Sequence, residues 1–222
     1  MKSFSIITIP VTPFKQNCSI LYDESCKKGV LVDPGGGLQD ILQQVKKHNI
    51  EIESIWLTHG HIDHIGVAKA ASRALKAPIL GPHQADAFLF ESLEDTAEKY
   101  KFSEKVENFT PDHWLEEGQL LGFADHSFKV YFTPGHSPGH VIYFNKKERL
   151  AVVGDVLFRG SIGRTDLLGS QPEDLMQSLS QKVLPLGDDV DFICGHGPAS
   201  TIGYEKEANP FIVRLLRKET RP

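Results

Sequence analysis

A short stretch about a quarter of the way along the chain constrains its fold more than any other. Residues 58–66 read THGHIDHIG and place His59, His61, Asp63 and His64 within six positions. They directly follow the apolar run IWLT, which predicts a buried strand. One interpretation is a polar surface loop. The other is half of a metal site, which requires the fold to bring further ligands to this strand end from distant parts of the chain.

Three further residues with ligand side chains occupy the same local setting. His136 follows KVYFT, Asp155 follows AVVG and His196 follows FICG, so each lies at the end of an apolar run. A lone histidine at a strand end is usually a hydrogen-bonded surface residue. Loops at strand ends, however, are where rigid scaffolds commonly carry functional residues, and strands that end on one side of a sheet bring such side chains together. The repeated setting therefore favours a metal site.

The spacing predicts how two cations would share these side chains. The two histidines of the H-x-H part can point the same way in an extended turn, and the Asp-His pair lies where the next helix starts. His136 can complete the first set and His196 the second, and Asp155 can bridge both. Nitrogen and carboxylate ligands without thiolate suit zinc, iron or manganese, so we expect two divalent metal ions. The first ion is assigned His59, His61, His136 and Asp155, and the second is assigned Asp63, His64, His196 and Asp155.

The periodicity along the chain predicts a mixed α/β domain. Short β-rich runs predict strands at 4–9, 17–23, 29–35, 53–58, 149–155 and 189–197, with mostly strand and turn between 114 and 144. Apolar spacing predicts helices at 38–48, 65–76 and 171–186, and a long loop with some helix at 91–113. Because no linker or low-complexity segment interrupts the chain, we expect residues 1–222 to form a single domain.

Charge and composition argue against several classes of partner. The formal net charge is −5 and the basic residues are scattered, whereas nucleic-acid binding usually shows a basic face. No run approaches about 18 uninterrupted apolar residues, so we expect no membrane span. Three dispersed cysteines and an N-terminus without the features of a signal peptide favour a reducing compartment. We expect a cytoplasmic protein that acts on a small molecule, as a monomer or a small homo-oligomer.

Residues near the predicted ligands receive other roles. Asp33 directly follows the run GVLV and is the first residue of DPGGG. We expect it to orient a ligand histidine. The alternative is that it forms a turn before Pro-Gly. Cys194, two residues before His196, is expected to be a small buried residue and not a ligand. The other histidines are expected at the surface or behind the ligands, namely His48, His83, His113, His126 and His140.

The sequence resembles the metallo-β-lactamase superfamily at all five of that superfamily's motifs. In chain order these are Asp33, the H-x-H-x-D-H stretch, His136, Asp155 and His196. The resemblance spans nearly the whole chain and implies a four-layer αββα sandwich, with two mixed sheets face to face, helices outside and metals at one edge. The stretches LTHGHIDHIG, TPGHSPGHV, GDVLFRGSIGRTDL and GHGP look most like type II glyoxalases (hydroxyacylglutathione hydrolases) and their small single-domain YcbL-type relatives. That resemblance implies a dinuclear site, commonly zinc with iron or manganese also accepted, and hydrolysis of S-lactoylglutathione or a related thioester.

The region that would recognise the substrate departs from the larger glyoxalases. Those enzymes carry a C-terminal helical domain that supplies much of the glutathione contact, but only 26 of the 222 residues follow His196 here, so we expect no separate C-terminal glutathione-binding domain. Arg164 in GSIGRTD is a candidate contact for a substrate carboxylate, and the alternative is an ion pair with Asp166. Tyr204, near the exit of the His196 loop, is a weaker candidate for a substrate contact.

The expected mechanism is metal-assisted hydrolysis. A hydroxide that bridges the two cations attacks the thioester carbonyl, and Asp63 both ligates and hydrogen-bonds this nucleophile. The main alternative is a mononuclear iron persulfide dioxygenase of the same fold, whose relatives also show a G-R-T-D segment like residues 163–166. An alternative of another class is a non-catalytic metal-binding protein. Loss of ligand residues would favour this alternative, but here every ligand position is filled. A β-lactamase role is disfavoured because the sequence shows no periplasmic signal.

Overall fold

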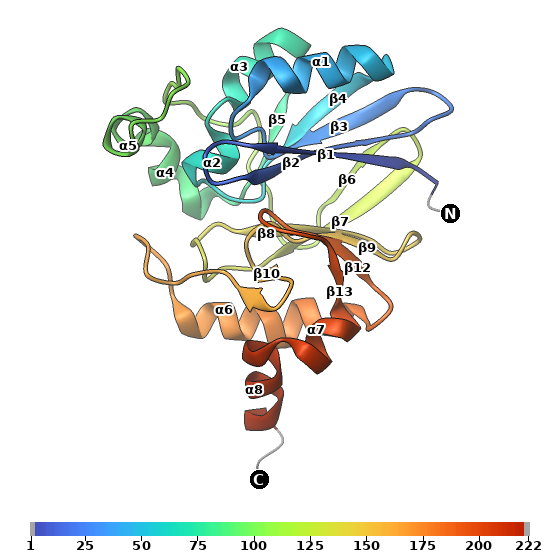
Figure 1. Ribbon diagram of the computed structural model, residues 1–222, viewed down its shortest axis with the longest axis vertical. Helices are drawn as coiled ribbons and strands as arrows, with labels where there is room; N and C mark the ends of the chain where they lie inside the picture. Colours follow the sequence, from blue (N-terminus) through green and yellow to red (C-terminus); the bar gives the residue numbers. More distant parts are fainter. Residues whose placement is uncertain (1–2, 220–222) are drawn as a thin grey trace.

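Two β-sheets stacked face to face form the centre of the computed structural model, which describes residues 3–219 (Figure 1). The first sheet has the order β1 (Ser5–Val11), β2 (Gln16–Tyr22), β3 (Lys28–Val32), β4 (Glu51–Trp56) and β5 (Ile79–Leu80). The second has the order β13 (Ser200–Thr201), β12 (Asp191–Ile193), β9 (Leu150–Val152), β8 (Val141–Asn145), β7 (His126–Phe132) and β6 (Leu120–Phe123). Strands β10 (Leu157–Phe158) and β11 (Ser161–Ile162) form a separate hairpin.

Both sheets mix parallel and antiparallel pairs. In the first sheet β1, β2 and β3 pair antiparallel, whereas β3, β4 and β5 pair parallel. In the second sheet β8 is antiparallel to both β7 and β9, and β12 is parallel to β9. Strands β7, β9 and β12 therefore run in one direction, and their carboxyl ends lie at the same edge of the sheet.

Helices cover the outer face of each sheet (Figure 1). On the side of the first sheet these are α1 (Leu38–His48), α2 (Ile62–Ile65) and α3 (Ala68–Leu75), with α4 (Ala87–Glu91) and α5 (Leu93–Tyr100) beside them. On the side of the second sheet they are α6 (Pro172–Ser178), α7 (Ile202–Ala208) and α8 (Pro210–Glu219). Three short helical turns complete the secondary structure: η1 (Gln84–Asp86), η2 (Leu179–Val183) and η3 (Leu184–Leu186). The expected αββα architecture is confirmed.

The core has three layers because the strands are apolar on both faces. In β8, Val141 and Tyr143 pack between the two sheets, whereas Ile142 and Phe144 pack with the cluster under the outer helices. Successive side chains of a strand point to opposite faces, so this alternation seats one strand against both neighbouring layers. Trp56 of β4 lies fully buried in the layer between the sheets, with its ring 5.1 Å from that of Tyr143.

The helix predicted at 65–76 is present as α3 but begins at Ala68, and a separate short helix, α2, precedes it with a break at Gly66 and Val67. At this break the Val67 amide donates a hydrogen bond to the Pro34 carbonyl at 3.1 Å. A Cβ at Gly66 would lie 2.6 Å from the Gly35 carbonyl oxygen, so only glycine allows this approach. The interruption therefore docks the H-x-H-x-D-H segment onto the loop that follows β3.

Other boundaries also differ from the sequence prediction. The helix expected at 171–186 continues after α6 as the η2 and η3 turns, and the strand expected at 189–197 is only Asp191–Ile193. In the segment expected to be a long loop with some helix, the helix is α5, which ends at Tyr100 and is followed by Lys101 with a left-handed φ of 52°. Helices α7 and α8 were not predicted; Ile202 and Ile212 anchor them in the core cluster under the second sheet.

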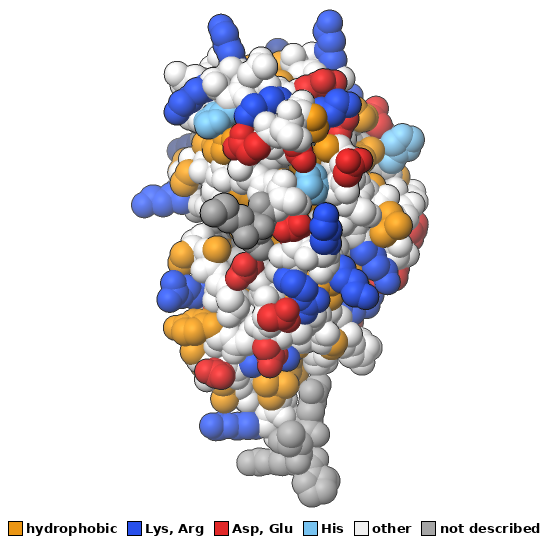
Figure 2. All heavy atoms as spheres, turned by 90° about the vertical axis from the view of Figure 1, so that its right-hand side faces the viewer, with side chains coloured by type: hydrophobic (Ala, Val, Ile, Leu, Met, Phe, Trp, Pro, Cys, Tyr) orange, Lys and Arg blue, Asp and Glu red, His pale blue; other side chains and the backbone are white. Residues whose placement is uncertain are grey.

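The outer surface and helix lengths bear on the expected partners. No helix within residues 3–219 is long and apolar enough to cross a membrane. On the face shown in Figure 2, basic and acidic side chains are interspersed and form no continuous basic stripe.

Candidate metal centre

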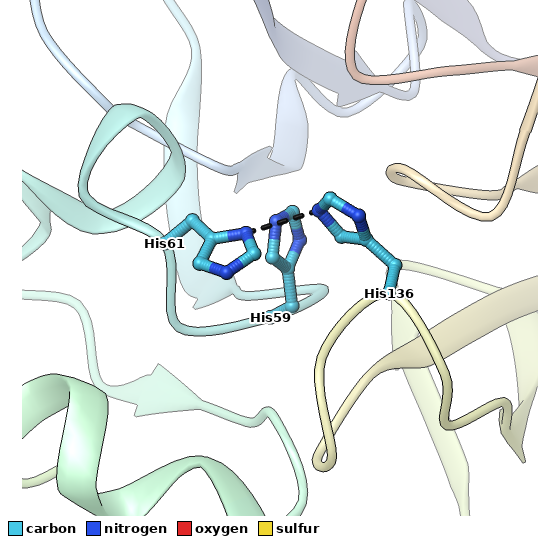
Figure 3. A group of neighbouring side chains, drawn as sticks. All are labelled: His59, His61 and His136. Carbon is cyan, nitrogen blue, oxygen red and sulfur yellow. Dashed lines mark hydrogen bonds between the residues drawn. The ribbon is translucent and has the colours of Figure 1, made fainter. Parts of the chain in front are cut away.

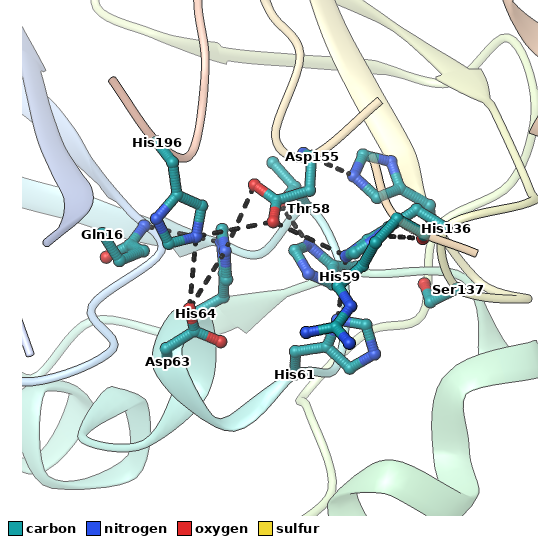
Figure 4. Close-up of polar contacts among 12 residues, drawn as sticks. Gln16, Thr58, His59, His61, Asp63, His64, His136, Ser137, Asp155 and His196 are labelled. Carbon is teal, nitrogen blue, oxygen red and sulfur yellow. Dashed lines mark hydrogen bonds and ion pairs between the residues drawn. The ribbon is translucent and has the colours of Figure 1, made fainter. Parts of the chain in front are cut away.

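The fold gathers all seven predicted ligand side chains at one edge of the two sheets (Figure 4). The H-x-H-x-D-H segment follows β4 of the first sheet. The other three residues, His136, Asp155 and His196, follow β7, β9 and β12, which end at the same edge of the second sheet. The Val141 amide donates to the Thr58 carbonyl at 2.8 Å and so joins the two sheets next to the cluster.

One group consists of His59, His61 and His136 (Figure 3). One ring nitrogen of each lies within 4.8 Å of the others, and His61 Nδ1 is 3.0 Å from His136 Nε2. Asp155 Oδ2 is 3.5 Å from His136 Nε2. These are the four side chains predicted for the first cation.

A second group consists of Asp63, His64 and His196. Asp63 Oδ2 lies 3.2 Å from His196 Nε2 and 4.0 Å from His64 Nε2. Asp155 also reaches this group, because its Oδ1 is 3.4 Å from His64 Nε2 and its Oδ2 is 3.5 Å from His196 Nε2. Asp155 therefore lies between the two groups, at the position predicted for a bridging carboxylate.

The donor set fits divalent cations. Among residues 3–219, four buried side-chain atoms have no hydrogen-bond partner: Gln16 Oε1, His59 Nε2, His64 Nε2 and Asp155 Oδ1. Buried polar atoms are normally hydrogen-bonded, so three orphans within one His/Asp cluster indicate a further binding partner there. Nitrogen and carboxylate donors without a thiolate suit zinc, iron and manganese.

Charge is distributed unevenly over the cluster. Burial, with a smaller effect of His64, holds the pKa of His59 well below its usual range, and burial lowers that of His61 to about 3. Neutral imidazole is the form that ligates a metal. At His64 burial opposes the charged form, but the carboxylates of Asp155 and Asp63 outweigh it and raise the pKa well above the usual range. A cation that binds here therefore competes with the proton of His64.

Hydrogen bonds at Nδ1 turn the Nε2 atoms of several histidines toward the cluster. Such bonds fix the tautomer and the ring orientation of metal ligands. The Nδ1 partners are Asp33 Oδ2 at 2.9 Å for His64, the Arg164 carbonyl at 2.9 Å for His136, and the Phe14 carbonyl at 3.1 Å for His196.

Asp33 holds this arrangement from behind. It is buried and left-handed, with φ 49°, and its Oδ1 accepts the Thr58 amide at 2.8 Å. Its Oδ2 accepts the Thr58 hydroxyl at 2.6 Å, and that hydroxyl lies 3.0 Å from His59 Nδ1. Asp33 thus contacts His64 directly and His59 through Thr58, the kind of role expected from its spacing.

Two further buried residues support the cluster, and only Asp86 of the two was missed from the sequence. His140, one of five histidines expected at the surface or behind the ligands, is fully buried and accepts the Asp155 amide at 3.1 Å on Nε2. Asp86 is also fully buried, and its Oδ2 accepts the Gly60 amide and the Ser137 hydroxyl, both at 2.8 Å. Asp86 therefore ties the His59–His61 loop to the loop that carries His136.

One glycine is required by close packing at the cluster. A Cβ at Gly195 would lie 2.0 Å from Asp155 Oδ1 and 2.5 Å from His64 Cε1. No side chain fits at this position, so glycine alone lets the β12 loop pass against both residues. The sequence signal for this contact was the glycine directly before His196 in FICGHG.

The cluster opens into a cavity of about 780 Å³. Five predicted ligands line the cavity: His61, Asp63, His136, Asp155 and His196. The other two, His59 and His64, lie behind them. Arg164 also lines the cavity, and its Nε and Nη2 donate to the two Asp166 oxygens at 2.6 and 2.7 Å. The ion pair considered for Arg164 is thus present, whereas its contact with a substrate carboxylate stays a prediction.

Tyr204, by contrast, is not among the residues that line the cavity. It lies on α7, about half exposed, with the Arg159 guanidinium 5.2 Å from its ring centre. In the neighbouring turn Ile202 and Glu205 face the interior, so the helical period turns Tyr204 outward. This position lends no support to the contact between Tyr204 and a substrate that the sequence suggested.

Comparison with known proteins agrees with this geometry. The profile of the metallo-beta-lactamase superfamily matches residues 11–197. Hydroxyacylglutathione hydrolase GloC of Haemophilus influenzae is 40% identical over 209 residues, which cover 94% of this chain and 98% of the relative.

Two solved structures are also similar over nearly their whole length. BLEG-1 B3 metallo-beta-lactamase has a TM-score of 0.86 at 35% identity and covers 94% of this chain and 99% of its own. TTHA1623, solved in a di-iron-bound form, has a TM-score of 0.82 at 34% identity and covers 92% and 99%. With the fold and the His/Asp cluster, these matches show that the chain belongs to the metallo-beta-lactamase superfamily.

Proposed function

We propose that this protein is a metal-dependent thioester hydrolase that acts on S-lactoylglutathione or a related thioester. The observation that carries the proposal is the position of the His/Asp cluster, which forms part of the wall of a cavity of about 780 Å³. That volume suits a small organic molecule. The 40% identity to a hydroxyacylglutathione hydrolase over nearly both full lengths supports the thioester as substrate.

We assign the seven side chains to two divalent cations, with Asp155 shared between them. His59, His61 and His136 would hold one ion, and Asp63, His64 and His196 the other. When bound, such ions polarise a carbonyl oxygen and lower the pKa of water toward neutrality. We propose zinc as the native metal, with iron as the alternative because the similar TTHA1623 was solved in a di-iron-bound form.

A carboxylate of the protein transfers the proton that the hydrolysis of a thioester requires. We assign this task to Asp63 because it lines the cavity, whereas Asp155 is the carboxylate shared between the two groups. In hydrolysis the water oxygen bonds to the carbonyl carbon and the carbon–sulfur bond breaks. Asp63 accepts one proton from the water and returns it to the departing sulfur, so that a carboxylic acid and a thiol are formed.

The test combines metal counting with turnover. Purified protein is reconstituted with zinc, iron or manganese, and the release of free thiol from S-lactoylglutathione is followed. We expect two ions per chain and thiol release. One iron per chain, with oxygen uptake on glutathione persulfide and no thiol release, would instead identify a persulfide dioxygenase. Bound metal without either reaction would favour a non-catalytic metal-binding protein.

β-Lactam hydrolysis is a second candidate, favoured by one observation. The similar structure with the TM-score of 0.86 is that of BLEG-1 B3 metallo-beta-lactamase. A β-lactam ring, like a thioester, presents an activated carbonyl to the same His/Asp cluster. Hydrolysis of a chromogenic cephalosporin by the same metal-loaded preparations separates the two candidates, because the ratio of the two kcat/KM values ranks them directly.

A further inference from the structure

Exposed apolar side chains gather around the entrance of the cavity. Among residues 3–219, six large apolar side chains are largely exposed, and three of these six line this one cavity. These three are Phe14 (51% exposed), Tyr100 (50%) and Leu168 (76%), which we call the apolar mouth. Scattered exposed apolar residues are ordinary, but a cluster at a cavity indicates a binding surface.

The apolar mouth is built from three separate segments. Phe14 lies in the turn between β1 and β2, Tyr100 ends α5, and Leu168 lies between β11 and α6. The rings of Phe14 and Tyr100 meet edge to face, with their centres 6.5 Å apart. Three segments that are distant in sequence thus place apolar side chains at one entrance, which argues for a function common to all three.

The wall of the cavity carries further apolar side chains. They include Ile62, Leu89, Leu93, Phe158, Ile162 and Leu167. A hydrocarbon group bound in the cavity therefore has apolar surface to contact. Such contact is favourable in proportion to the area removed from water.

Charged groups beyond the cluster are few. Lys99, Arg164 and Asp166 are the charged side chains of the described residues that line the cavity outside the His/Asp cluster. Asp166 occupies the Nε and Nη2 edge of the Arg164 guanidinium. Lys99 forms no salt bridge within residues 3–219 and lies 5.6 Å from the centre of the Tyr100 ring. One cation without a carboxylate partner matches a single carboxylate, whereas glutathione carries two carboxylates and an ammonium group.

We infer that the substrate is a thioester with an aromatic or branched hydrocarbon group, which the apolar mouth binds while the carbonyl faces the His/Asp cluster. This inference rests on the proposed thioesterase function and narrows its substrate class. The hydrocarbon belongs either to the acyl group or to the thiol, and both present the same chemistry to Phe14, Tyr100 and Leu168.

Three thioesters separate these sources: S-lactoylglutathione, S-mandeloylglutathione with a phenyl-bearing acyl group, and the lactoyl thioester of benzyl mercaptan. With the metal-loaded protein, we expect at least one aromatic thioester to exceed S-lactoylglutathione about tenfold in kcat/KM. The double variant Phe14→Ala/Leu168→Ala should reduce this ratio toward one. In Leu120→Ala, a matched control 70% exposed on β6 and outside the cavity, the ratio should be unchanged.

A binding measurement keeps the inference testable without turnover. The thioethers S-benzylglutathione and S-methylglutathione cannot be hydrolysed, and their Kd values can be measured by calorimetry. We expect the benzyl compound to bind about tenfold more tightly, and the double variant to lose this preference. Equal Kd values, or a preference that the double variant retains, would overturn the inference. Absence of turnover for all three thioesters would overturn the proposed function separately, because the Kd ratio still reports on the apolar mouth.

Discussion

Replacement of Asp86 by asparagine tests how the two ligand loops are held together. The carboxylate accepts the Gly60 amide and the Ser137 hydroxyl on Oδ2 and the Gly139 amide at 2.5 Å on Oδ1. An asparagine amide offers one oxygen, which accepts, and one NH2 group, which donates. The backbone N–H of either Gly60 or Gly139 must therefore face the NH2 group in place of an acceptor. A buried donor without a partner costs roughly 1–3 kcal/mol. We expect Asp86→Asn to lower the free energy of unfolding by about that amount where Asp86 is uncharged.

The pH dependence of this difference has a definite sign. Burial raises the pKa of Asp86 to about 6, above its ordinary value of 3.8. The folded state therefore holds the proton more tightly than the unfolded state, and Asp86 lowers the stability of the wild type as pH rises between these two values. Worked from both pKa values, the loss between pH 4.5 and 7 is about 2 kcal/mol. Asparagine does not titrate, so the advantage of the wild type over Asp86→Asn should shrink by this amount.

The assay is urea unfolding of the metal-free proteins at pH 4.5 and 7, with zinc affinity measured at pH 7 by competition with a chelator. Loss of a group that orients metal ligands typically costs about 10–100-fold in affinity, and we expect Asp86→Asn to fall in that range. Asp112→Asn is the control, because exposed Asp112 accepts only the Ile79 amide, at 2.7 Å and away from the cluster. A pH-independent difference in unfolding, or zinc affinity equal to that of the wild type, would refute the reasoning.

Three further predictions concern the cluster itself. His59→Ala and Asp155→Ala should each lower turnover of S-lactoylglutathione by several orders of magnitude in steady-state assays, and near-normal turnover in either variant would contradict the ligand assignment. Gly195→Ala should reduce the metal bound per chain, measured by elemental analysis, because its Cβ would lie 2.0 Å from Asp155 Oδ1; full loading would show that the β12 loop can move aside. Removal of metal by a chelator should abolish turnover. Addition of zinc at 100 times its Kd should raise the free energy of unfolding of the metal-free protein by about 2.7 kcal/mol, and an unchanged urea midpoint would mean that zinc does not bind the folded state preferentially.

The cluster could be predicted from the sequence because its positions follow from strand direction. His136, Asp155 and His196 each follow an apolar run, and β7, β9 and β12 run the same way in one sheet. Residues at the carboxyl ends of such strands meet at one edge of the sheet, independently of the conformation of the connecting loops. The two-residue period of Val141 to Phe144, apolar on both faces, likewise requires layers on both sides of the sheet.

The groups that support the cluster could not be predicted in this way. Asp86 stands in GPHQADAF, where an acidic residue before an apolar run reads as the start of a helix. Its burial depends on Gly60 and Ser137, which lie 26 and 51 residues away along the chain. Only the packed structure brings these groups together, so no local pattern distinguishes Asp86 from an exposed carboxylate.

The described segment after His196 supports the wall of the cavity and does not itself line it. Glu205 is fully buried and accepts the Gly160 amide at 2.7 Å. Asn209 donates from Nδ2 to the carbonyls of Phe158 at 3.3 Å and Ser161 at 2.9 Å. These bonds hold the β10–β11 hairpin, which supplies Phe158 and Ser161 to the wall of the cavity. Glu205 of α7 and Asn209, which follows that helix, therefore support the cavity wall. We expect changes at either residue to alter KM for thioesters through the hairpin, and changes at Tyr204 to leave KM unaltered.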